Sequence, residues 1–338
     1  MDAILLQFLN GLDKGGAYAL IALGLTLIFG TLGVVNFAHG ALFMIGAFCA
    51  VAFHRLLTVS KVVKDESITF FDAYKEVPYL TAWFGDFGQT LIDYAVPLSI
   101  LLAIPIMLLL GLAIERGLIR HFYGRSHADQ ILVTFGLAIV LQEIIKAWFG
   151  ANPIPAPAPA AFAGSANVGA WLGLGGGVSY PWWRLVYFLF SLAVIGLVFA
   201  FLKYTTFGMV VRAGMRDRET VGLLGINIQK RFTIVFAIAV IVAGLAGAMY
   251  APILSPHYHM GMEFLVLSFV VVVVGGMGSL EGAVLAGFLL GILQSFAAMN
   301  QVKALIPGID QVIIYLVAIV VLLVRPRGLM GRAGVMES

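Results

Sequence analysis

Residues 15–54 read GGAYALIALGLTLIFGTLGVVNFAHGALFMIGAFCAVAFH, a stretch without a single Asp, Glu, Lys or Arg. Hydrocarbon cannot hydrogen-bond to the backbone, so a stretch of this kind in a membrane must be helical. One straight helix of this length would reach about 60 Å, twice the hydrocarbon thickness of about 30 Å. The chain must therefore turn within the stretch, and Gly30, Gly33 and the run from Asn36 to Gly40 (NFAHG) mark the place.

The composition of the whole chain indicates a membrane protein. Of 338 residues, 61% are hydrophobic and 11% are charged, and the mean hydropathy is +1.02. An ordinary soluble domain has about 25% charged residues. These values exclude a cytoplasmic enzyme, a nucleic-acid-binding protein and a secreted disulfide scaffold. The one cysteine, Cys49, lies in an apolar run, and we expect it to be a core residue.

The sequence predicts an all-α fold, a polytopic membrane helical bundle with about eight to ten hydrophobic helices, some of them short or broken. A second glycine-rich break, Gly275 to Gly282 (GGMGSLEG), divides the apolar region 264–302. We expect the helices at 40–54, 262–276 and 310–324 to be short, so that some of them do not cross fully. The nine predicted helices span residues 5–29, 40–54, 91–114, 130–149, 184–203, 232–250, 262–276, 283–299 and 310–324.

Basic residues predict the orientation of the helices. Twelve of the twenty Lys and Arg residues lie in three segments, 116–125, 203–231 and 325–332. The nine-helix order puts these three segments on one face of the membrane. By the positive-inside rule this is the cytoplasmic face.

We expect one transmembrane domain over residues 1–338. Its segment 204–231 is cytoplasmic, and 55–90, which has mixed charge, forms an extracytoplasmic insertion. Residues 150–183 also face outward. Their alternating prolines, from Pro153 to Pro159, favour extended polyproline II over helix.

Asn36 and His39 are polar residues inside the first charge-free stretch, where an unsatisfied group is costly. In one interpretation, Asn36 caps a helix that begins near Phe37, and His39 donates to a carbonyl freed by the break. In the other, both residues line a substrate path or gate at the broken helix. The two interpretations are compatible and stay open. No second ligand has a suitable spacing for a metal at His39.

The breaks at Asn36–Gly40 and Gly275–Gly282 are predicted to lie on opposite walls of one solute path. Non-helical backbone at membrane depth is tolerated only where protein or water surrounds it. The alternative is that both breaks are plain cytoplasmic turns. The candidate path or gate residues are Asn36, His39, Gly40, Gly275, Gly276, Gly278 and Ser279.

A motif of small residues, Gly287-x-x-x-Gly291, permits a close helix contact. That contact is either internal packing or an interface with another subunit. The sequence does not separate these alternatives.

Residues 212–231, RAGMRDRETVGLLGINIQKR, lie between two hydrophobic helices on the basic face. Asp217 and Glu219 begin a short helical pattern with apolar positions that include Leu224. Gly225 and Asn227 can end this helix, since both tolerate the left-handed conformation. Such a segment is either a juxtamembrane helix beside anionic headgroups or a docking element for a soluble partner.

Four motifs, in order along the chain, resemble those of permeases from branched-chain amino acid ABC importers. They are NFAHG at 36–40, the coupling segment at 212–227, GGMGSLEGA at 275–283 and RPRGLMG at 325–331. The first motif resembles the LivH-like half of such permease pairs more than the LivM-like half. The resemblance covers residues 10–54 and 91–331, whereas 55–90 departs from the pattern and receives no role from it.

This resemblance implies a transport subunit without its own ATPase, and the sequence contains no Gly-x-x-x-x-Gly-Lys-[Ser/Thr] phosphate loop. No catalytic residue, metal or cofactor is expected in this chain, because ATP and Mg would be bound by two separate ATP-binding subunits. The residues implied in coupling to those subunits are Arg212, Asp217, Arg218, Glu219, Leu224, Gly225, Ile226 and Asn227.

The resemblance also implies the other partners and the location. They are a second, LivM-like permease and a periplasmic substrate-binding protein, which would deliver its load to the face formed by 150–183 and 251–261. Membrane lipid surrounds the chain, no nucleic acid binds it, and the bacterial inner membrane holds it as a multi-pass protein. The expected substrates are branched-chain or other hydrophobic amino acids, or related small solutes such as amides and urea.

The alternative function is a secondary transporter or channel for a small solute. A coupled transporter usually needs an intramembrane acid or base, and the longest predicted spans contain none. A membrane-embedded enzyme needs clustered titratable residues, which six scattered histidines do not supply.

Overall fold

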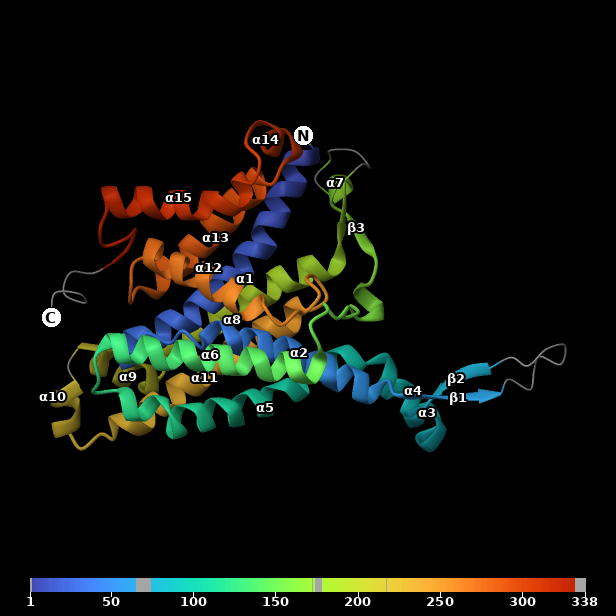
Figure 1. The fold of residues 1–338 in the computed structure, drawn as a ribbon, viewed down its shortest axis with the longest axis horizontal. Helices are drawn as coiled ribbons and strands as arrows, with labels where there is room; N and C mark the ends of the chain where they lie inside the picture. The colour runs from blue at the N-terminus through green and yellow to red at the C-terminus, as the bar shows by residue number, and fades with distance from the viewer. Residues whose placement is uncertain (1, 65–73, 172, 174–177, 217, 332–338) are drawn as a thin grey trace.

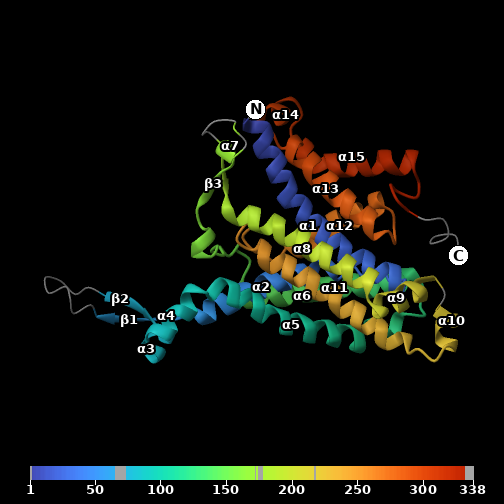
Figure 2. The same cartoon turned by 180° about the vertical axis from the view of Figure 1, so that it is seen from behind.

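The computed structural model describes residues 2–64, 74–171, 173, 178–216 and 218–331. These residues form a helical bundle with two small hairpins outside it (Figures 1 and 2). The predicted fold class is confirmed.

All nine predicted hydrophobic helices are present, with ends that differ from the prediction by up to four residues. Seven are long and apolar enough to span a membrane, while α12 and α15 are shorter. The segment 40–54, expected to be short, extends to 19 residues and belongs to the seven. The nine are α1 (Asp2–Leu32), α2 (His39–Leu57), α5 (Ala95–Gly117), α6 (His127–Phe149), α8 (Trp182–Tyr204), α11 (Ile228–Tyr250), α12 (Met260–Gly275), α13 (Leu280–Ala297) and α15 (Ile309–Val324).

The smaller elements all lie in the connections between these helices. Two antiparallel hairpins, β1–β2 and β3–β4, were not foreseen from the sequence. Two short 3-10 helices span Ile119–Phe122 and Ala160–Phe162. The remaining strands and α-helices are β1 (Ser60–Lys64), β2 (Tyr74–Pro78), α3 (Tyr79–Phe84), α4 (Asp86–Asp93), β3 (Ser165–Asn167), α7 (Val168–Trp171), β4 (Ser179–Pro181), α9 (Thr206–Arg216), α10 (Arg218–Leu223) and α14 (Asn300–Leu305).

Helix α1 lies at the centre of the bundle and packs most closely along α13. Glycines on both helices make this approach possible. A Cβ atom at Gly287 would lie 2.7 Å from the Ala19 backbone, and one at Gly15 would lie 2.8 Å from Phe288. Gly291 faces Gly15 in the same seam. The Gly287-x-x-x-Gly291 motif therefore serves packing inside this chain.

The bundle has two chemically different ends (Figure 1). At one end, which we call the basic end, lie the α5–α6 connection, α9, α10 and the segment after α15. At the other, the insertion end, lie the β1–β2 hairpin with α3 and α4, and the β3–β4 hairpin. The three basic segments thus share one end, as the nine-helix order predicts.

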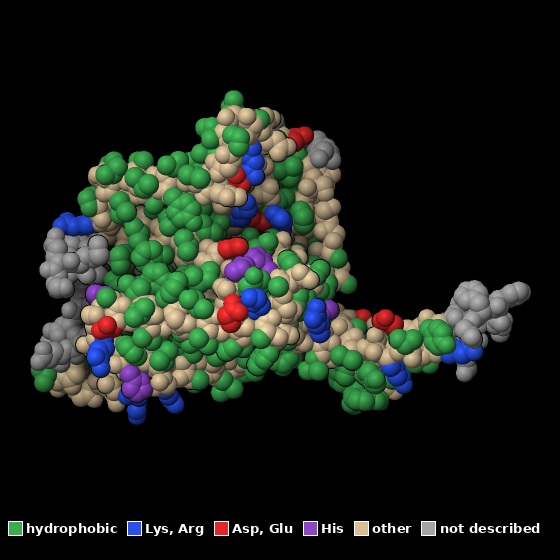
Figure 3. Space-filling model, viewed as in Figure 1, with side chains coloured by type: hydrophobic (Ala, Val, Ile, Leu, Met, Phe, Trp, Pro, Cys, Tyr) green, Lys and Arg blue, Asp and Glu red, His purple; other side chains and the backbone are tan. Residues whose placement is uncertain are grey.

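The flank between the two ends is apolar. Outer helices such as α5, α6 and α8 keep less than half of their residues buried, and the exposed ones include Leu109, Leu132 and Leu197. Hydrophobic side chains cover most of this flank in Figure 3, and charged side chains gather toward the ends. This surface suits lipid, so the chain is a multi-pass membrane protein.

Candidate functional site

The first break connects α1 to α2 through a tight turn. Gly33 has a φ of +66°, which favours glycine. The Asn36 side-chain oxygen accepts a hydrogen bond of 3.0 Å from the Ala38 backbone N–H. The helix begins at His39 rather than near Phe37, and its N-cap residue is Ala38. Asn36 therefore supports the turn that precedes α2, and the prediction that it caps a helix at Phe37 was wrong by two residues.

This break lies inside the bundle. The Phe37 N–H donates to the Thr134 hydroxyl at 3.0 Å, and Thr134 is seven residues, or about 10 Å, along α6 from its start. The His39 ring packs against Gly24, which lies eight residues before the end of α1. Two neighbouring helices thus place the break well inside the basic end, and protein surrounds its non-helical backbone.

Several polar atoms at the first break are unsatisfied. Asn36 and His39 are fully buried, and within the described residues the Asn36 Nδ2 and both His39 ring nitrogens lack a hydrogen bond of ordinary geometry. The bond from His39 to a freed carbonyl, predicted from the sequence, is therefore missing. An unpaired buried polar group costs about 1–3 kcal/mol. The break thus holds unused hydrogen-bonding capacity.

Gly40 lies at the start of α2, where that helix touches α12. A Cβ atom here would collide with the Gly261 carbonyl and with Leu265. Gly40 is therefore a packing residue, and a leucine in its place would separate two helices rather than fill an open path.

The second break connects α12 to α13 at the basic end. Gly276 and Gly278 have φ values of +105° and +82°, and Ser279 caps α13 by accepting from the Gly282 N–H at 3.1 Å. Gly275 packs backbone to backbone against Gly282. This geometry is that of a capped turn, the alternative left open by the sequence.

The segment that follows α15 covers this turn. The Leu329 N–H donates to the Val274 carbonyl at 2.8 Å, and the Met330 N–H donates to the Gly275 carbonyl at 2.9 Å. These bonds satisfy carbonyls that the end of α12 leaves free. The RPRGLMG motif at 325–331 is thus a backbone clamp on the second break.

The two breaks differ in their surroundings, although both were predicted to line one solute path. The first is buried in the bundle, whereas the second is a clamped turn at its end, and α12 lies between them. The Phe37 ring lies 5.4 Å from the Phe269 ring of α12, six residues before the second break. The structure therefore connects the breaks through one helix.

The predicted coupling segment forms two helices at the basic end. Helix α9, which precedes the predicted pattern, was missed, although Phe207, Val211 and Gly214 repeat at helical spacing toward α8 and α11. Arg212 is exposed on it. Asp217 lies outside the described residues, as do the side chains of Arg218 and Glu219.

Helix α10 ends before an exposed turn. Leu223 and Leu224 are 83% and 72% exposed. They place two apolar side chains on the surface of the basic end. Gly225 has a φ of +77° and ends the helix as predicted. Asn227, in contrast, begins the next helix: its side chain accepts from the Lys230 N–H at 3.0 Å as the N-cap of α11. Ile226 is partly buried between them.

A charged network near the insertion end was missed by the sequence analysis. Asp13, on α1, is 1% exposed and pairs with Arg184 of α8 at 3.0 Å. Arg184 also donates to the Asn10 side chain at 3.1 Å, and the Tyr180 hydroxyl donates to Asp13 at 3.2 Å. Burial, together with the nearby Asp13 charge, raises the pKa of Tyr180, which keeps this phenol protonated as a donor.

The statement that the longest spans lack an acid or base was wrong, because α1 includes Asp13 and Lys14. The signal was present in the sequence, because these two charged residues directly precede the charge-free run that begins at Gly15.

Comparison with known proteins identifies the family. The family described as branched-chain amino acid transport system / permease component matches residues 7–322. The chain belongs to this family. Among its relatives, LivH of Salmonella typhimurium, a high-affinity branched-chain amino acid transport system permease protein, is 27% identical over 96% of this chain and 95% of its own length. BraD of Pseudomonas aeruginosa, with the same description, is 29% identical with the same coverage.

More distant similarity reaches the ribose import permease RbsC of Escherichia coli, at 24% identity over 67% of this chain and 70% of that protein. No solved structure matches the chain. Membership in the branched-chain amino acid permease family covers every helix described above except the ends of α1 and α15. It decides between the two transport classes in favour of an ABC importer permease.

Proposed function

We propose that this chain is the LivH-like permease subunit of an ABC importer that moves branched-chain amino acids inward across the bacterial inner membrane. The observation that carries the proposal is the family match over residues 7–322, together with relatives named as high-affinity branched-chain amino acid permeases. The four motifs lie in places that such a role requires: two at helix breaks, one on an exposed segment and one at the basic end.

The energy would come from two ATP-binding subunits that carry ATP and Mg. Their docking site is the α9–α10 segment at the basic end, which faces the cytoplasm by its charge. The exposed Leu223 and Leu224 supply the apolar contact, and Arg212 lies on the same segment. The proposed coupling set keeps Asp217, Arg218 and Glu219.

Delivery would take place at the insertion end, from a periplasmic substrate-binding protein. Residues 153–159, with their alternating prolines, form what we call the proline strap. The strap lies beside the turn after α11, and the Ile154 N–H donates to the Pro256 carbonyl at 2.9 Å. The two outward segments thus form one platform. A LivM-like permease completes the membrane part of the proposed complex.

The first break would act as the gate of this permease. Asn36 Nδ2 has no hydrogen-bond partner among the described residues, and the His39 ring has only a contact with the Ile21 backbone, so an alternative arrangement with water or solute there has hydrogen bonds to gain. The clamped second break, with Gly275, Gly276, Gly278 and Ser279, would pass movement from the basic end to α12.

The docking proposal is tested with two exposed leucines. Leu224→Asp places a charge in the proposed apolar contact, and we expect substrate-stimulated ATP hydrolysis and leucine uptake to fall at least tenfold in the reconstituted complex. Leu305→Asp is the matched control, since Leu305 is 82% exposed on α14, away from the basic end. Equal activity of the two variants would refute docking at α10.

A further inference from the structure

The insertion 55–90 has no role in the function described so far, although its described part exposes a cluster of aromatic side chains. Trp83, Phe84 and Phe87 are 72%, 56% and 63% exposed. They belong to α3 and α4, which together we call the outer helix pair. Tyr94, directly after α4, is 61% exposed. Large apolar side chains left together in water are unfavourable, so this cluster indicates a contact surface.

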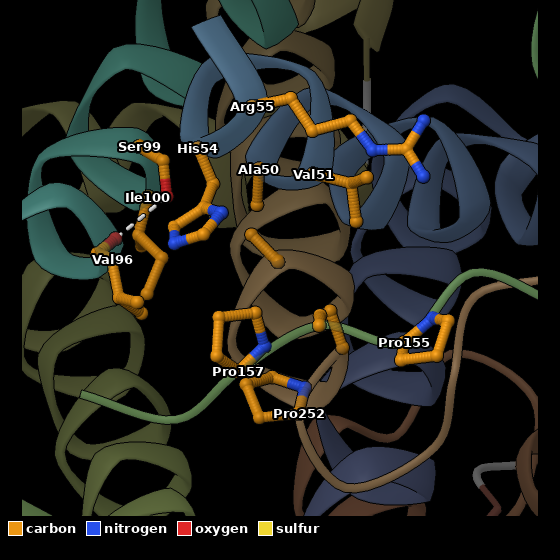
Figure 4. A pocket seen from close by; sticks show the side chains of 13 residues that line it. Ala50, Val51, His54, Arg55, Val96, Ser99, Ile100, Pro155, Pro157 and Pro252 are labelled. Atoms are coloured by element: carbon orange, nitrogen blue, oxygen red, sulfur yellow. Dashed lines mark hydrogen bonds between the residues drawn. The ribbon is translucent and has the colours of Figure 1, made fainter. Parts of the chain in front are cut away.

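The outer helix pair lies at the insertion end, next to the outer ends of α2 and α5 (Figure 1). The Tyr79 N–H, at the start of α3, donates to the Val59 carbonyl at 3.0 Å, just after the end of α2. That end of α2 packs on α5. Figure 4 shows the His54 ring of α2 beside Ile100 of α5, with Pro157 of the proline strap below it. The start of the pair is therefore attached to the bundle.

Helix α4 continues the lipid-facing surface of α5. The Tyr94 N–H donates to the Thr90 carbonyl at 3.2 Å, and the Leu98 N–H donates to the Tyr94 carbonyl at 3.0 Å, so helical hydrogen bonds cross the junction. Helical residues three or four positions apart share one face. One such face, which we call the outer stripe, is hydrophobic throughout and reaches the exposed Leu101 on the apolar flank. It consists of Phe87, Leu91, Tyr94, Leu98 and Leu101.

The opposite face of α4 is polar. Asp86, Gln89 and Asp93 are exposed there, and the Gln89 Nε2 donates to the Asp93 carboxylate at 2.9 Å. A third side of α4 faces α3, because a Cβ atom at Gly88 would collide with the Leu80 carbonyl. The outer stripe is thus the side of α4 that neither the carboxylates nor α3 occupy.

The length of the two helices decides which layer of the membrane the outer stripe reaches. From Arg116, at the basic end of α5, the helices rise about 33 Å to Tyr94 and about 44 Å to Phe87. The hydrocarbon layer is about 30 Å thick, and the bilayer with its headgroups is about 40–45 Å thick. With Arg116 at the inner surface, Tyr94 lies near the outer hydrocarbon boundary and Phe87 among the outer headgroups. Aromatic side chains with a polar end, Trp and Tyr, are enriched in this layer.

We propose that the outer helix pair binds the outer surface of the membrane, with its aromatic side chains among the phospholipid headgroups and the polar face of α4 in water. Figure 3 shows hydrophobic side chains at this end of the molecule, adjacent to the apolar flank, so the lipid contact of α5 extends onto the pair. The contact fixes the base of the β1–β2 hairpin outside the membrane. This inference uses the orientation predicted from charge and does not depend on which solute is transported.

Fluorescence quenching at two positions of α4 tests the contact. In a Cys49→Ala background, Phe87→Cys on the outer stripe and Gln89→Cys on the polar face each receive a bimane label, and the full chain is placed in lipid nanodiscs. Phosphatidylcholine with a nitroxide near its headgroup should quench the label at 87 at least twofold more than the label at 89. Aqueous iodide should quench the label at 89 at least twofold more than the label at 87.

Equal quenching of the two positions by the lipid nitroxide, or by iodide, would overturn the proposal. If iodide reached both labels and the lipid nitroxide reached neither, the aromatic surface would be left to a protein partner. The measurement requires neither ATP nor transport. A complex that does not import leucine would therefore refute the proposed function and leave this inference untouched.

Removal of the aromatic side chains of α3 gives a second measurement. With the label at position 87, Trp83→Ser/Phe84→Ser should raise iodide quenching at least twofold, because α4 loses neighbouring contacts with lipid. Trp171→Ser is the control, since Trp171 is 61% exposed at the same end but belongs to α7. Equal iodide quenching in the two variants would count against the aromatic contact.

Discussion

At the scale of single residues, the Asp13–Arg184 pair joins a buried carboxylate to a partly exposed arginine across two helices. Asp13 is almost inaccessible, whereas the Arg184 side chain is 32% exposed. Removing the arginine leaves a buried carboxylate without its opposite charge. Removing both charges leaves no unpaired charge, although the Tyr180 hydroxyl and the Asn10 side chain each lose a partner. The pair joins α1 to α8, so its loss acts on the packing of two membrane helices.

We expect Arg184→Ala to destabilise the protein by about 1.5–3 kcal/mol, the value for a lost hydrogen bond to a charged group. The double variant Asp13→Leu/Arg184→Leu should recover most of this loss. Unfolding in mixed detergent micelles measures both. Lys146→Ala is the control, because its pair with Glu143 is exposed and worth about 0.2–1 kcal/mol.

The contact between Gly24 and His39 gives a second prediction at this scale. A methyl group at Gly24 would collide with the His39 ring, so Gly24→Ala should cost about 1–3 kcal/mol through overpacking. Adding His39→Ala should relieve the collision. Gly136→Ala on α6, where a Cβ meets nothing within 4 Å, should instead stabilise slightly by helix propensity. Thermal unfolding measures the stability of each variant. If Gly24→Ala lowers stability equally in the presence and absence of His39→Ala, the contact between Gly24 and the His39 ring is refuted.

At the scale of elements, the clamp on the second break depends on one glycine. Gly328 has a φ of +76°, and a Cβ there would lie 2.6 Å from the Val273 carbonyl. Gly308 has a similar φ of +80° but open space around it. Both glycines avoid backbone strain, and only Gly328 also permits close contact with α12.

Gly328→Ala should therefore release the clamp, whereas Gly308→Ala should pay only the strain of about 1–2 kcal/mol. Hydrogen exchange at Leu329 and Met330 measures the difference, since their N–H groups bond to α12. We expect faster exchange at both amides in Gly328→Ala alone. Protection that survives this substitution would contradict the clamp.

At the scale of the whole molecule, the distribution of charge predicts the orientation of the chain in the membrane. Arg125 lies at the basic end and Lys75 on the hairpin at the insertion end, and both are exposed. In a Cys49→Ala background, an impermeant thiol reagent applied outside intact cells should label Lys75→Cys and leave Arg125→Cys unlabelled until the membrane is permeabilised. Labelling of position 125 in intact cells would show that the orientation is the opposite of the one predicted.

The sequence by itself determined the nine helices and the two breaks, because hydrophobic length and glycine punctuation are local properties. It also indicated the end of α10 at Gly225, where backbone conformation depends on that residue alone. Asn227 shows the limit of local patterns, since the same residue type ends one helix or begins the next.

Only the tertiary structure decided which of these residues are fixed by packing and which could take part in transport. The depth of the first break depends on Thr134 and Gly24, both far from it in sequence. Asp13 became a buried partner because α8 brings Arg184 beside it. The proline strap is held at the turn after α11 because the Ile154 N–H reaches the Pro256 carbonyl. These are contacts between distant segments, and no local pattern encodes which segments meet.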